Sequence, residues 1–510
     1  MEDPHKEVEG QQKRTRAERR MIMATKLEGN MWTSRWGLVL ASIGMAVGTG
    51  NIWRFPRVSA ANGGAAFFFA YILALFVWAI PLLAVEGVFG KTARMGVIGS
   101  FKHMCGRAWT WVGALMAIIV LGVVFYYAVV VGWCIRYFLY AATGTLKPGL
   151  DTEALWKAFA ANGTMQGILL VVVIAACVFI ASKGIAAGLE RANKIMVPAI
   201  FVLLIFLAIR AAFLPNAVKG YEFYFTARAA DFLNPKTYLE AFTQVSWSTG
   251  AGWGLFLTYF VYVKKREDIM LTAVTTCFAD TTAAFTAGMC VIPTIFAFSP
   301  DPMAAVKSGN TGLAFIHLTK LFCEIPGGTI MALAFFLALI LAALSSEIAM
   351  IELGARILED AGWNRKKATW GIALATLVLG MPSALSGTFL DNQDWVWGVG
   401  LMVSCLLLGV AAIKVGVAKI WAEIVEPDTV IKQAWMFKVV YFTPILFAWV
   451  FGWWFKQAIS WYPGEWYKWL PISKYTFTPG TMLWQWGIAA AVCIILNNWL
   501  ADKMTHRLEV

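Results

Sequence analysis

Asn51 and Arg54, two side chains able to bind ions, lie in the apolar stretch of residues 42–56. The stretch reads Ser-Ile-Gly-Met-Ala-Val-Gly-Thr-Gly-Asn-Ile-Trp-Arg-Phe-Pro, and three glycines, at 44, 48 and 50, precede these two residues. Glycine weakens a helix, and an arginine at bilayer depth is costly. A helix that breaks here frees carbonyl oxygens for a small hard cation and amide groups for a carboxylate. The stretch therefore predicts a site for ions and zwitterions.

A second stretch, residues 246–254, has the same character and reads Ser-Trp-Ser-Thr-Gly-Ala-Gly-Trp-Gly. Three glycines in five residues interrupt an apolar segment near its centre. For either stretch alone, glycine that only permits close helix packing is an alternative explanation. Two matched interruptions beside polar groups instead indicate two broken helices whose breaks meet at the membrane midplane.

The elements that carry these stretches are membrane helices. The 510-residue chain is 59% hydrophobic and only 14% charged, which is typical of a polytopic membrane protein. Apolar segments of about 18–25 residues span a bilayer, and we count twelve, at 36–57, 65–90, 109–140, 166–182, 193–213, 238–263, 270–298, 327–357, 368–387, 395–417, 439–456 and 480–500. The interrupted segments are the first and the sixth, so each opens a unit of five helices. Five helices place the second unit upside down relative to the first, as in inverted-repeat transporters.

Lysine and arginine predict the orientation, because they are enriched on the cytoplasmic side. Residues 13–20 are strongly basic, and so are loops 91–108, 264–268 and 356–367, whereas loop 388–394 has no basic residue. Both termini are therefore expected in the cytoplasm of a multi-pass protein of the plasma (inner) membrane. The net charge of +12 is mostly this bias, so no nucleic-acid partner is expected. The expected partners are membrane lipid and a small zwitterionic substrate, with the chain a monomer or a homodimer.

Enzymatic motifs are absent from the sequence. We find no nucleophile elbow, phosphate loop or metal-ligand pair, and the four histidines form no cluster. The eight cysteines lie mainly in apolar segments and have no metal or disulfide spacing. The sequence therefore predicts a protein that is not an enzyme.

The motifs resemble those of the neurotransmitter:sodium symporters, including the bacterial leucine-transporter type. The resemblance extends from Trp32 to about Val417 and rests on residues 44–56, 62–67, 126–127, 248–254, 344–346 and 391–395, with Pro81 and Glu86. It implies an all-α membrane protein of twelve transmembrane helices, a 5+5 inverted repeat with broken helices 1 and 6 and two accessory helices. The predicted regions are a basic cytoplasmic tail at 1–35, a first repeat at 36–213, a second repeat at 238–418, and helices 11 and 12 with a short cytoplasmic C-terminus at 433–510.

The resemblance also implies two sodium sites. The first would use the Ala46 carbonyl and the side chains of Asn51, Ser248 and Asp280, completed by the substrate carboxylate. The second would use the carbonyls of Gly44, Val47 and Ala342 and the hydroxyls of Ser345 and Ser346. All of these are hard oxygen ligands suited to an alkali cation. For the two serines alone, hydroxyls bonded to their own helix would be the default explanation.

Two gates follow from the same resemblance. Arg54 and Asp394 would close the extracellular side, beside Tyr127, whose hydroxyl would bind the substrate carboxylate. Trp32 and Asp360 would close the cytoplasmic side. The family places an arginine near the N-terminus as partner of this acid, but Gly29 stands there in this chain, with Lys26 as a substitute.

The resemblance implies a substrate pocket made by Met45, Gly48, Gly50, Val123, Tyr127, Trp247, Ser248, Gly250, Trp253, Ser346 and Met350. The family's monoamine carriers have an aspartate at the position of Gly48. Its absence leaves room for a carboxylate, so we expect a neutral amino acid, hydrophobic or aromatic. The glycines of the second break would remove bulk and admit a larger substrate.

The two tryptophans allow another interpretation. The family commonly has phenylalanine at positions 247 and 253, and two indoles can cage a quaternary ammonium group. Packing against a neutral amino acid is the favoured explanation. A sodium-coupled carrier of a betaine is the alternative, and a non-transporting amino-acid sensor on the same fold is a second one.

Chloride is the remaining question that the resemblance raises. Animal members need chloride near the first sodium, and many bacterial members replace it with a glutamate where this chain has Ala284. Asp280, one helical turn away, would supply the missing charge. Tyr71, Gln244 and Ser248 would then hydrogen-bond that carboxylate. We therefore expect sodium-coupled, chloride-independent symport by alternating access.

Overall fold

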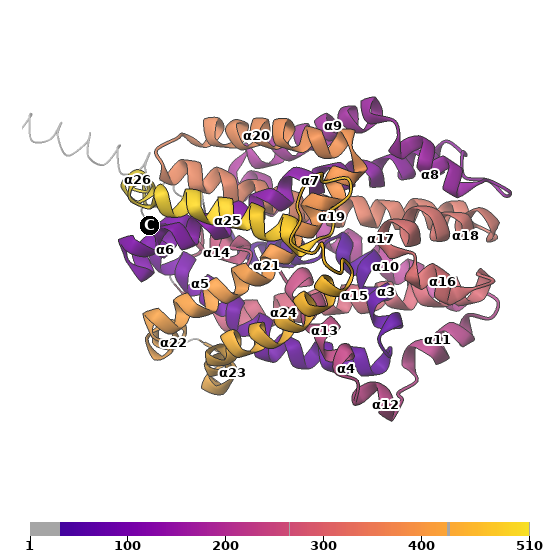
Figure 1. Cartoon of the computed structure of the whole chain (residues 1–510), viewed down its shortest axis with the longest axis horizontal. Coiled ribbons are helices and arrows are strands. Elements are labelled where there is room, and N and C mark those ends of the chain that lie inside the picture. Colours follow the sequence, from indigo (N-terminus) through magenta and orange to yellow (C-terminus); the bar gives the residue numbers. More distant parts are fainter. Residues whose placement is uncertain (1–30, 265, 426–428, 509–510) are drawn as a thin grey trace, which may run out of the picture.

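The computed structural model describes residues 31–264, 266–425 and 429–508. Within these ranges all regular structure is helical and no strand occurs, which confirms the all-α prediction. Many of the longer helices run along the long axis of the molecule (Figure 1). They form one bundle around a buried apolar core.

Nine helical segments of the described residues are long and apolar enough to cross a membrane: Ala65–Ala93, Arg107–Ala142, Gly163–Ala181, Ile185–Ala212, Ile269–Phe298, Gly328–Asp360, Arg365–Leu385, Gly387–Val415 and Ala434–Ser460. Two bent pairs raise the number to eleven, namely Arg35–Ala46 with Gly50–Ala61 and Pro479–Ile495 with Asn497–Lys503. The predicted segment 238–263 contains two helices that are each too short to span alone. Twelve spans in two inverted repeats thus remain a prediction.

The first predicted break is present in the structure. Helix α2 (Arg35–Ala46) ends where Val47 is extended, with ψ of 100°. The helical path resumes as a π-helical turn, η1 (Gly50–Arg54), and continues as α3 (Phe55–Ala61). The two halves are bent by 55°. Backbone groups around residue 48 are therefore released from the helix, as the glycine pattern predicted.

The second break lies between α13 (Pro235–Ser248) and α14 (Leu255–Phe260). Gly250, Gly252 and Gly254 all have φ between +72° and +79°, a region that only glycine adopts without strain. A Cβ on Gly252 would also lie 2.4 Å from the Cys405 Sγ. Gly252 therefore permits close backbone packing. The expectation that it enlarges the substrate pocket is not met, because it does not line the cavity.

Long helices surround the two breaks. These are α7 (Thr110–Ala142), α10 (Arg191–Ala212), α15 (Ile269–Phe298), α19 (Gly328–Asp360) and α21 (Gly387–Val415). Helix α2 packs against α10, α15 and α19, and α7 packs along α19. Helix α5 (Ile80–Ala93) is almost entirely buried and packs against α14 and α15. Outer helices include α4 (Ala65–Ala74), α9 (Gly163–Ala181), α20 (Arg365–Leu385), α24 (Thr443–Ser460), α25 (Pro479–Ile495) and α26 (Asn497–Lys503). The bundle thus holds both breaks in its interior.

Loops that were predicted to share one side contact one another. The Lys102 Nζ donates to the Ala501 carbonyl at 2.6 Å, and Arg356 donates to the His506 carbonyl at 3.2 Å. At the opposite end, the Gly149 amide donates to Glu324 at 3.1 Å. Figure 1 places α26 and the C-terminus at one end, and α8 (Thr152–Ala160) and α18 (Thr319–Glu324) at the other.

Candidate functional site

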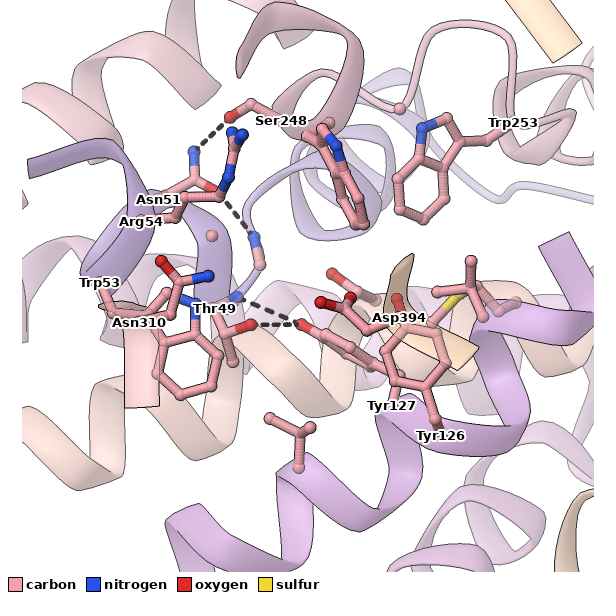
Figure 2. A pocket seen from close by; sticks show the side chains of 18 of the residues that line it. Thr49, Asn51, Trp53, Arg54, Tyr126, Tyr127, Ser248, Trp253, Asn310 and Asp394 are labelled. Atoms are coloured by element: carbon pink, nitrogen blue, oxygen red, sulfur yellow. Dashed lines mark hydrogen bonds between the residues drawn. The ribbon is translucent and has the colours of Figure 1, made fainter. Parts of the chain in front are cut away.

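A cavity lies where the two breaks meet. Its walls come from η1, α7, α13, α19 and α21 and from the short helix α17 (Gly309–Thr311), as Figure 2 shows in part. All eleven predicted pocket residues line it: Met45, Gly48, Gly50, Val123, Tyr127, Trp247, Ser248, Gly250, Trp253, Ser346 and Met350. Residues that are far apart in the sequence therefore meet at one site because the helices break.

Three predicted ligands of the first sodium form one buried cluster. The Asn51 Nδ2 donates to the Ser248 Oγ at 3.0 Å and to the Asp280 Oδ1 at 2.6 Å. The Ser248 hydroxyl donates to the Asp280 Oδ2 at 2.8 Å. Ala46, the fourth predicted ligand, also lines the cavity. The cluster is rich in hard oxygen donors and carries one acid, a set that suits a small monovalent cation.

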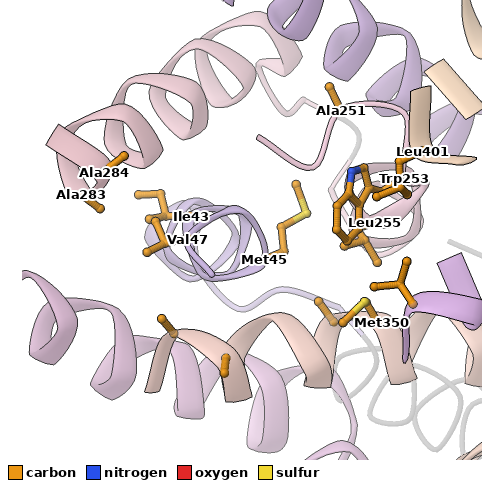
Figure 3. Packing of buried hydrophobic residues seen from close by; sticks show 14 of the residues in the cluster. Ile43, Met45, Val47, Ala251, Trp253, Leu255, Ala283, Ala284, Met350 and Leu401 are labelled. Atoms are coloured by element: carbon orange, nitrogen blue, oxygen red, sulfur yellow. The ribbon is translucent and has the colours of Figure 1, made fainter. Parts of the chain in front are cut away.

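Asp280 is buried in the middle of α15 and is fully shielded from solvent. The Tyr71 hydroxyl donates to its Oδ2 at 3.3 Å, as expected. Gln244 does not bond to the acid: its Oε1 accepts a hydrogen bond from Arg54, and its Nε2, the donor, has no partner among the described residues. Ala284, one turn along, is buried beside α2 in an apolar cluster (Figure 3). Asp280 is therefore the acid of this cluster in the described chain.

The predicted ligands of the second sodium also converge. The Ser346 Oγ lies 3.5 Å from the carbonyl oxygens of Gly44 and Val47, and 3.2 Å from that of Ala342. The Ser345 hydroxyl donates to the Ala342 carbonyl at 2.9 Å. Back-bonding within α19 accounts for part of this pattern. It does not account for the carbonyls of the broken helix α2, which face the same hydroxyl.

The predicted extracellular gate residues line the cavity but do not pair. Arg54 donates to the Gln244 Oε1, and no ion pair joins it to Asp394 among the residues that the structure describes. The Tyr127 hydroxyl accepts a hydrogen bond from the Thr49 amide at 3.1 Å (Figure 2). Thr49 thus fixes the tyrosine at the first break, with its hydroxyl at the cavity wall.

Apolar side chains form one wall of the cavity. The rings of Trp247 and Trp253 lie 6.4 Å apart with an interplanar angle of 73°. Met45 and Met350 lie near Trp253 (Figure 3). The Trp247 ring packs on the backbone of Gly398, where a Cβ would lie 2.0 Å from its Cη2. Methionine and indole surfaces suit an apolar group of adaptable shape.

Comparison with known proteins agrees with this geometry. The family described as "Sodium:neurotransmitter symporter family" matches residues 29–156 and 150–506. The chain belongs to the sodium:neurotransmitter symporter family. It is a sodium-dependent membrane transporter, and the prediction that it is not an enzyme is confirmed.

Relatives of this symporter come from distant organisms. An uncharacterized sodium-dependent transporter of Methanocaldococcus jannaschii is 32% identical over 417 residues, 78% of this chain and 82% of the relative. The human sodium- and chloride-dependent GABA transporter 2 is 22% identical over 85% of this chain and 84% of its own length. The crystal structure of MhsT in complex with L-phenylalanine is similar, with a TM-score of 0.74, 31% identity, and coverage of 83% of this chain and 99% of MhsT.

Both residues that were predicted to close the cytoplasmic side, Trp32 and Asp360, are buried. The Trp32 Nε1 donates to the Tyr259 carbonyl at 2.9 Å. Asp360 is fully buried and accepts hydrogen bonds from Arg356 at 2.5 and 2.9 Å and from the Gly96 amide at 2.6 Å. Arg356, four residues away on α19, is therefore a basic partner of Asp360 in the described part of the chain. Gly29 and Lys26 lie outside the described residues.

Several cavity residues of the symporter were not predicted from the sequence. They are Thr49, Trp53, Tyr126, Val130, Trp133, Asn310, Thr311, Leu390 and Asp391. Val130 and Trp133 follow Val123 and Tyr127 on α7 at helical spacing, so the face of that helix could have revealed them. Asn310 and Thr311 belong to a connection far from both breaks, and no local pattern indicated their position.

Proposed function

We propose that this symporter couples the sodium gradient to uptake of a neutral amino acid with a hydrophobic or aromatic side chain, without chloride. The observation that carries the proposal is the buried cluster of Asn51, Ser248 and Asp280 at the meeting point of the two breaks. It supplies oxygen ligands and a fixed negative charge at one place. Sodium is cargo here, so its site must bind the ion and release it.

Two sodium sites are supported by the donors present. The first would take the Ala46 carbonyl, Asn51, Ser248 and Asp280, together with the substrate carboxylate. The second would take the oxygens of Gly44, Val47, Ala342, Ser345 and Ser346. Carbonyls released by the first helix break contribute to both sites, so binding of sodium would stabilise the shape of the break.

Chloride independence follows from the charge at position 280. A sodium ion in a site of low dielectric needs a compensating negative charge. Asp280 is fully buried and accepts hydrogen bonds from Asn51, Ser248 and Tyr71, so a negative charge is already built into the site. An additional chloride would place two anionic charges side by side, which is unfavourable.

The substrate class follows from the cavity walls. Gly48 has no side chain, and the Tyr127 hydroxyl and Ser346 Oγ lie 3.1 and 3.2 Å from where its Cβ would stand. Because no acid occupies this corner, a substrate carboxylate can lie beside the first sodium. The apolar wall of Met45, Met350 and the indoles would hold the side chain. The similarity to MhsT, which was crystallised in complex with L-phenylalanine, supports such a substrate.

A betaine is the alternative substrate, since both indoles line the cavity. The arrangement of Trp247 disfavours it. The Arg54 guanidinium carbon lies 5.8 Å from the centre of that ring, so a second cation would meet a positive charge there. The contact with Gly398 also fixes the ring by packing. The indoles are therefore assigned to the apolar wall.

Transport would proceed by alternating access about the central cavity. Arg54 and Asp394, both in the cavity wall, would approach each other when the outer side closes. Trp32, Arg356 and Asp360 would separate when the inner side opens. The basic loops support a cytoplasmic position for this inner side and for both termini, with the chain in the plasma (inner) membrane.

A binding and transport experiment tests the proposal. Thermal-shift assays of the purified chain would compare phenylalanine, leucine and glycine betaine, each with and without sodium. We expect sodium-dependent stabilisation by the amino acids, because a ligand that binds the folded state raises its stability. Uptake into proteoliposomes with chloride replaced by gluconate tests the anion requirement. Stabilisation without any sodium-driven accumulation would instead identify a sensor.

A further inference from the structure

The Thr49 hydroxyl bonds differently from the hydroxyls of other buried threonines in this chain. A threonine inside a helix usually donates to the carbonyl four residues earlier, and this holds for Thr272, Thr276, Thr281, Thr294 and Thr376. The carbonyl that Thr49 would use belongs to Met45, but the chain leaves the helix at Val47. The Thr49 Oγ1 lies instead 3.1 Å from the Tyr127 hydroxyl of α7 (Figure 2). The break therefore releases this hydroxyl for a bond across the cavity wall.

Two groups of Thr49 reach the same phenol oxygen. The Thr49 amide donates to the Tyr127 hydroxyl at 3.1 Å, and the Thr49 hydroxyl lies at the same distance. A hydroxyl oxygen has two acceptor positions and one O–H donor. Thr49 is only 2% exposed, whereas Tyr127 is partly exposed at the cavity wall, so the Thr49 proton is best placed on the phenol. Both acceptor positions of Tyr127 are then filled, and its own O–H is left to donate into the cavity.

This O–H lies at the corner that the substrate carboxylate would occupy. A Cβ on Gly48 would stand 3.1 Å from the Tyr127 oxygen, and the Gly48 amide is bonded to Asn51 of the first sodium cluster. A carboxylate only accepts hydrogen bonds. A phenol that is free to rotate can turn its lone pairs toward the carboxylate, which is repulsive, whereas a phenol held as a donor is already matched to it. Fixing the donor in advance lowers the cost of ordering on binding.

We propose that Thr49 is a positioning residue for substrate recognition, whose hydroxyl fixes the Tyr127 O–H as a donor toward the substrate carboxylate. The inference rests on the proposed function, in which the substrate carries a carboxylate at this corner. It adds a side chain that acts on the tyrosine and not on the substrate. Neither hydroxyl is a proposed sodium ligand, so sodium binding without substrate should not depend on Thr49.

The test measures equilibrium binding of labelled phenylalanine to the purified chain in saturating sodium. Thr49→Ala and Thr49→Ser differ by one hydroxyl, and Thr49→Val replaces that hydroxyl with a methyl group of similar size. We expect the alanine and valine variants to raise the Kd about three- to tenfold, as for the loss of one neutral hydrogen bond, and the serine variant to stay within about twofold of wild type. Thr376→Val is the control and should leave the Kd unchanged, because the Thr376 hydroxyl bonds within its own helix.

A double-mutant cycle with Tyr127→Phe separates positioning from direct contact. Tyr127→Phe should raise the Kd by itself. Adding Thr49→Val to it should change the Kd by less than about twofold, because the phenol that Thr49 orients is already absent. If Thr49→Val raises the Kd by the same factor in both backgrounds, the hydroxyl acts on the substrate or on the shape of the break, and the proposal is overturned. A Thr49→Ser protein as weak as Thr49→Ala would overturn it as well, and this pair carries the comparison if Thr49→Val does not fold or Tyr127→Phe does not bind.

Sodium binding without amino acid gives a second measurement that a merely structural role of Thr49 would alter. Tryptophan fluorescence would follow sodium titrations of each variant, since Trp53, Trp247 and Trp253 line the cavity. We expect the wild-type sodium affinity in all Thr49 variants. A loss of sodium affinity as large as the loss of phenylalanine affinity would show that the variants damage the break, and it would refute the positioning role.

The behaviour of the wild-type chain distinguishes this inference from the proposed function. If the wild type bound no amino acid, the substrate class would be wrong, and the carboxylate that Tyr127 is proposed to meet would be lost with it. If the wild type bound phenylalanine with sodium and Thr49→Ala and Thr49→Val bound it equally well, only the role of Thr49 would be wrong.

Discussion

Asn51 and Asp280 are joined by a hydrogen bond of 2.6 Å from the amide nitrogen to the carboxylate Oδ1. The bond connects the first helix break to the middle of α15, and both side chains are buried. The same asparagine accepts a hydrogen bond from the Gly48 amide at 2.9 Å. A change of charge at position 280 would therefore alter the hydrogen bonds that Asn51 makes, including the one that holds the backbone of the break at Gly48.

Replacing that charge should impair transport. We expect Asp280→Asn to lower sodium-driven uptake by more than about a hundredfold, since leaving a buried sodium ion without its charged partner costs on the order of 3–5 kcal/mol. The measurement is initial uptake of labelled phenylalanine in proteoliposomes. Wild-type uptake should be unchanged when gluconate replaces chloride, and a collapse there would contradict the role of Asp280.

Chloride should restore part of the lost activity in Asp280→Asn. Tyr71 and Ser248 now donate to the acid and would be free to donate to an anion. The Gln244 Nε2 is buried and has no partner among the described residues, so it offers a third donor. Uptake by the variant should therefore rise with chloride concentration, and equal uptake in chloride and gluconate would argue against this anion site.

Gly48 should tolerate no side chain, whereas Gly452 on α24, away from the cavity, should. A Cβ at Gly48 would lie 3.1 Å from the Tyr127 hydroxyl, but nothing lies within 4 Å of a Cβ at Gly452. We expect Gly48→Asp to abolish amino-acid binding through overlap and charge repulsion, and Gly48→Ala to weaken it. Gly452→Ala is the matched control and should bind within about threefold of wild type, a difference below 1 kcal/mol. Thermal shift with phenylalanine and sodium measures all three, and unchanged binding in Gly48→Asp would remove Gly48 from the pocket.

Ser346→Ala should weaken sodium binding at the second site. A hydrogen bond or ligand contact to a charged group contributes about 1.5–3 kcal/mol, so half-maximal uptake should need roughly tenfold or more sodium. Thr376→Ala is a suitable control, since the Thr376 hydroxyl is buried and bonds within its own helix to the Ile372 carbonyl at 2.8 Å. Equal sodium dependence of the two variants would show that Ser346 only back-bonds.

Trp253→Leu should distinguish the two interpretations of the indoles. The Trp253 Nε1 donates to the Ser246 carbonyl at 3.1 Å, so the ring is held by the second break. If the ring belongs to an apolar wall, the Trp253→Leu variant should bind phenylalanine moderately more weakly than wild type. Glycine betaine should bind to neither protein. A wild-type preference for the betaine over its primary-amine analogue, lost in Trp253→Leu, would support a cage instead.

Much of this fold could be predicted because membrane helices obey strong local rules. Backbone groups in lipid must bond within a helix, so long apolar segments indicate helices, and glycine clusters indicate breaks. Both breaks lie where the sequence predicted them, at Val47 to Thr49 and at Thr249 to Gly254. The pocket residues on these breaks followed from the resemblance, and every one of them lines the cavity.

Contacts set by side-chain choice were less predictable. Arg54 has several possible acceptors near it, and its bond to Gln244 in place of Asp394 depends on rotamers that no sequence pattern specifies. Gly252 was expected to remove bulk beside the pocket, although its φ of +79° and the contact that a Cβ there would make with Cys405 assign it to the packing of the break. Arg356 was missed because the family pattern directed attention to the N-terminus, whereas its i, i+4 spacing from Asp360 was visible in the sequence.

The Arg356–Asp360 ion pair should control closure of the cytoplasmic side. Both side chains are nearly or fully buried, with 5% and 0% exposure, so removing the arginine leaves an unpaired acid beside the Gly96 amide. Breaking a buried pair costs about 3–5 kcal/mol. The backbone carbonyl of Asp360 also accepts hydrogen bonds from the amides of Thr505 and His506. A shift of Asp360 would therefore also weaken the attachment of the C-terminal segment. We therefore expect Arg356→Ala to favour the inward-open state, with faster efflux from preloaded proteoliposomes and weaker sodium binding.

Arg107→Ala is the control, since Arg107 pairs with Asp502 at 2.6 Å on the surface, where an ion pair contributes at most about 1 kcal/mol. Efflux rates that agree between Arg356→Ala and Arg107→Ala would show that the buried pair does not hold the inner side closed.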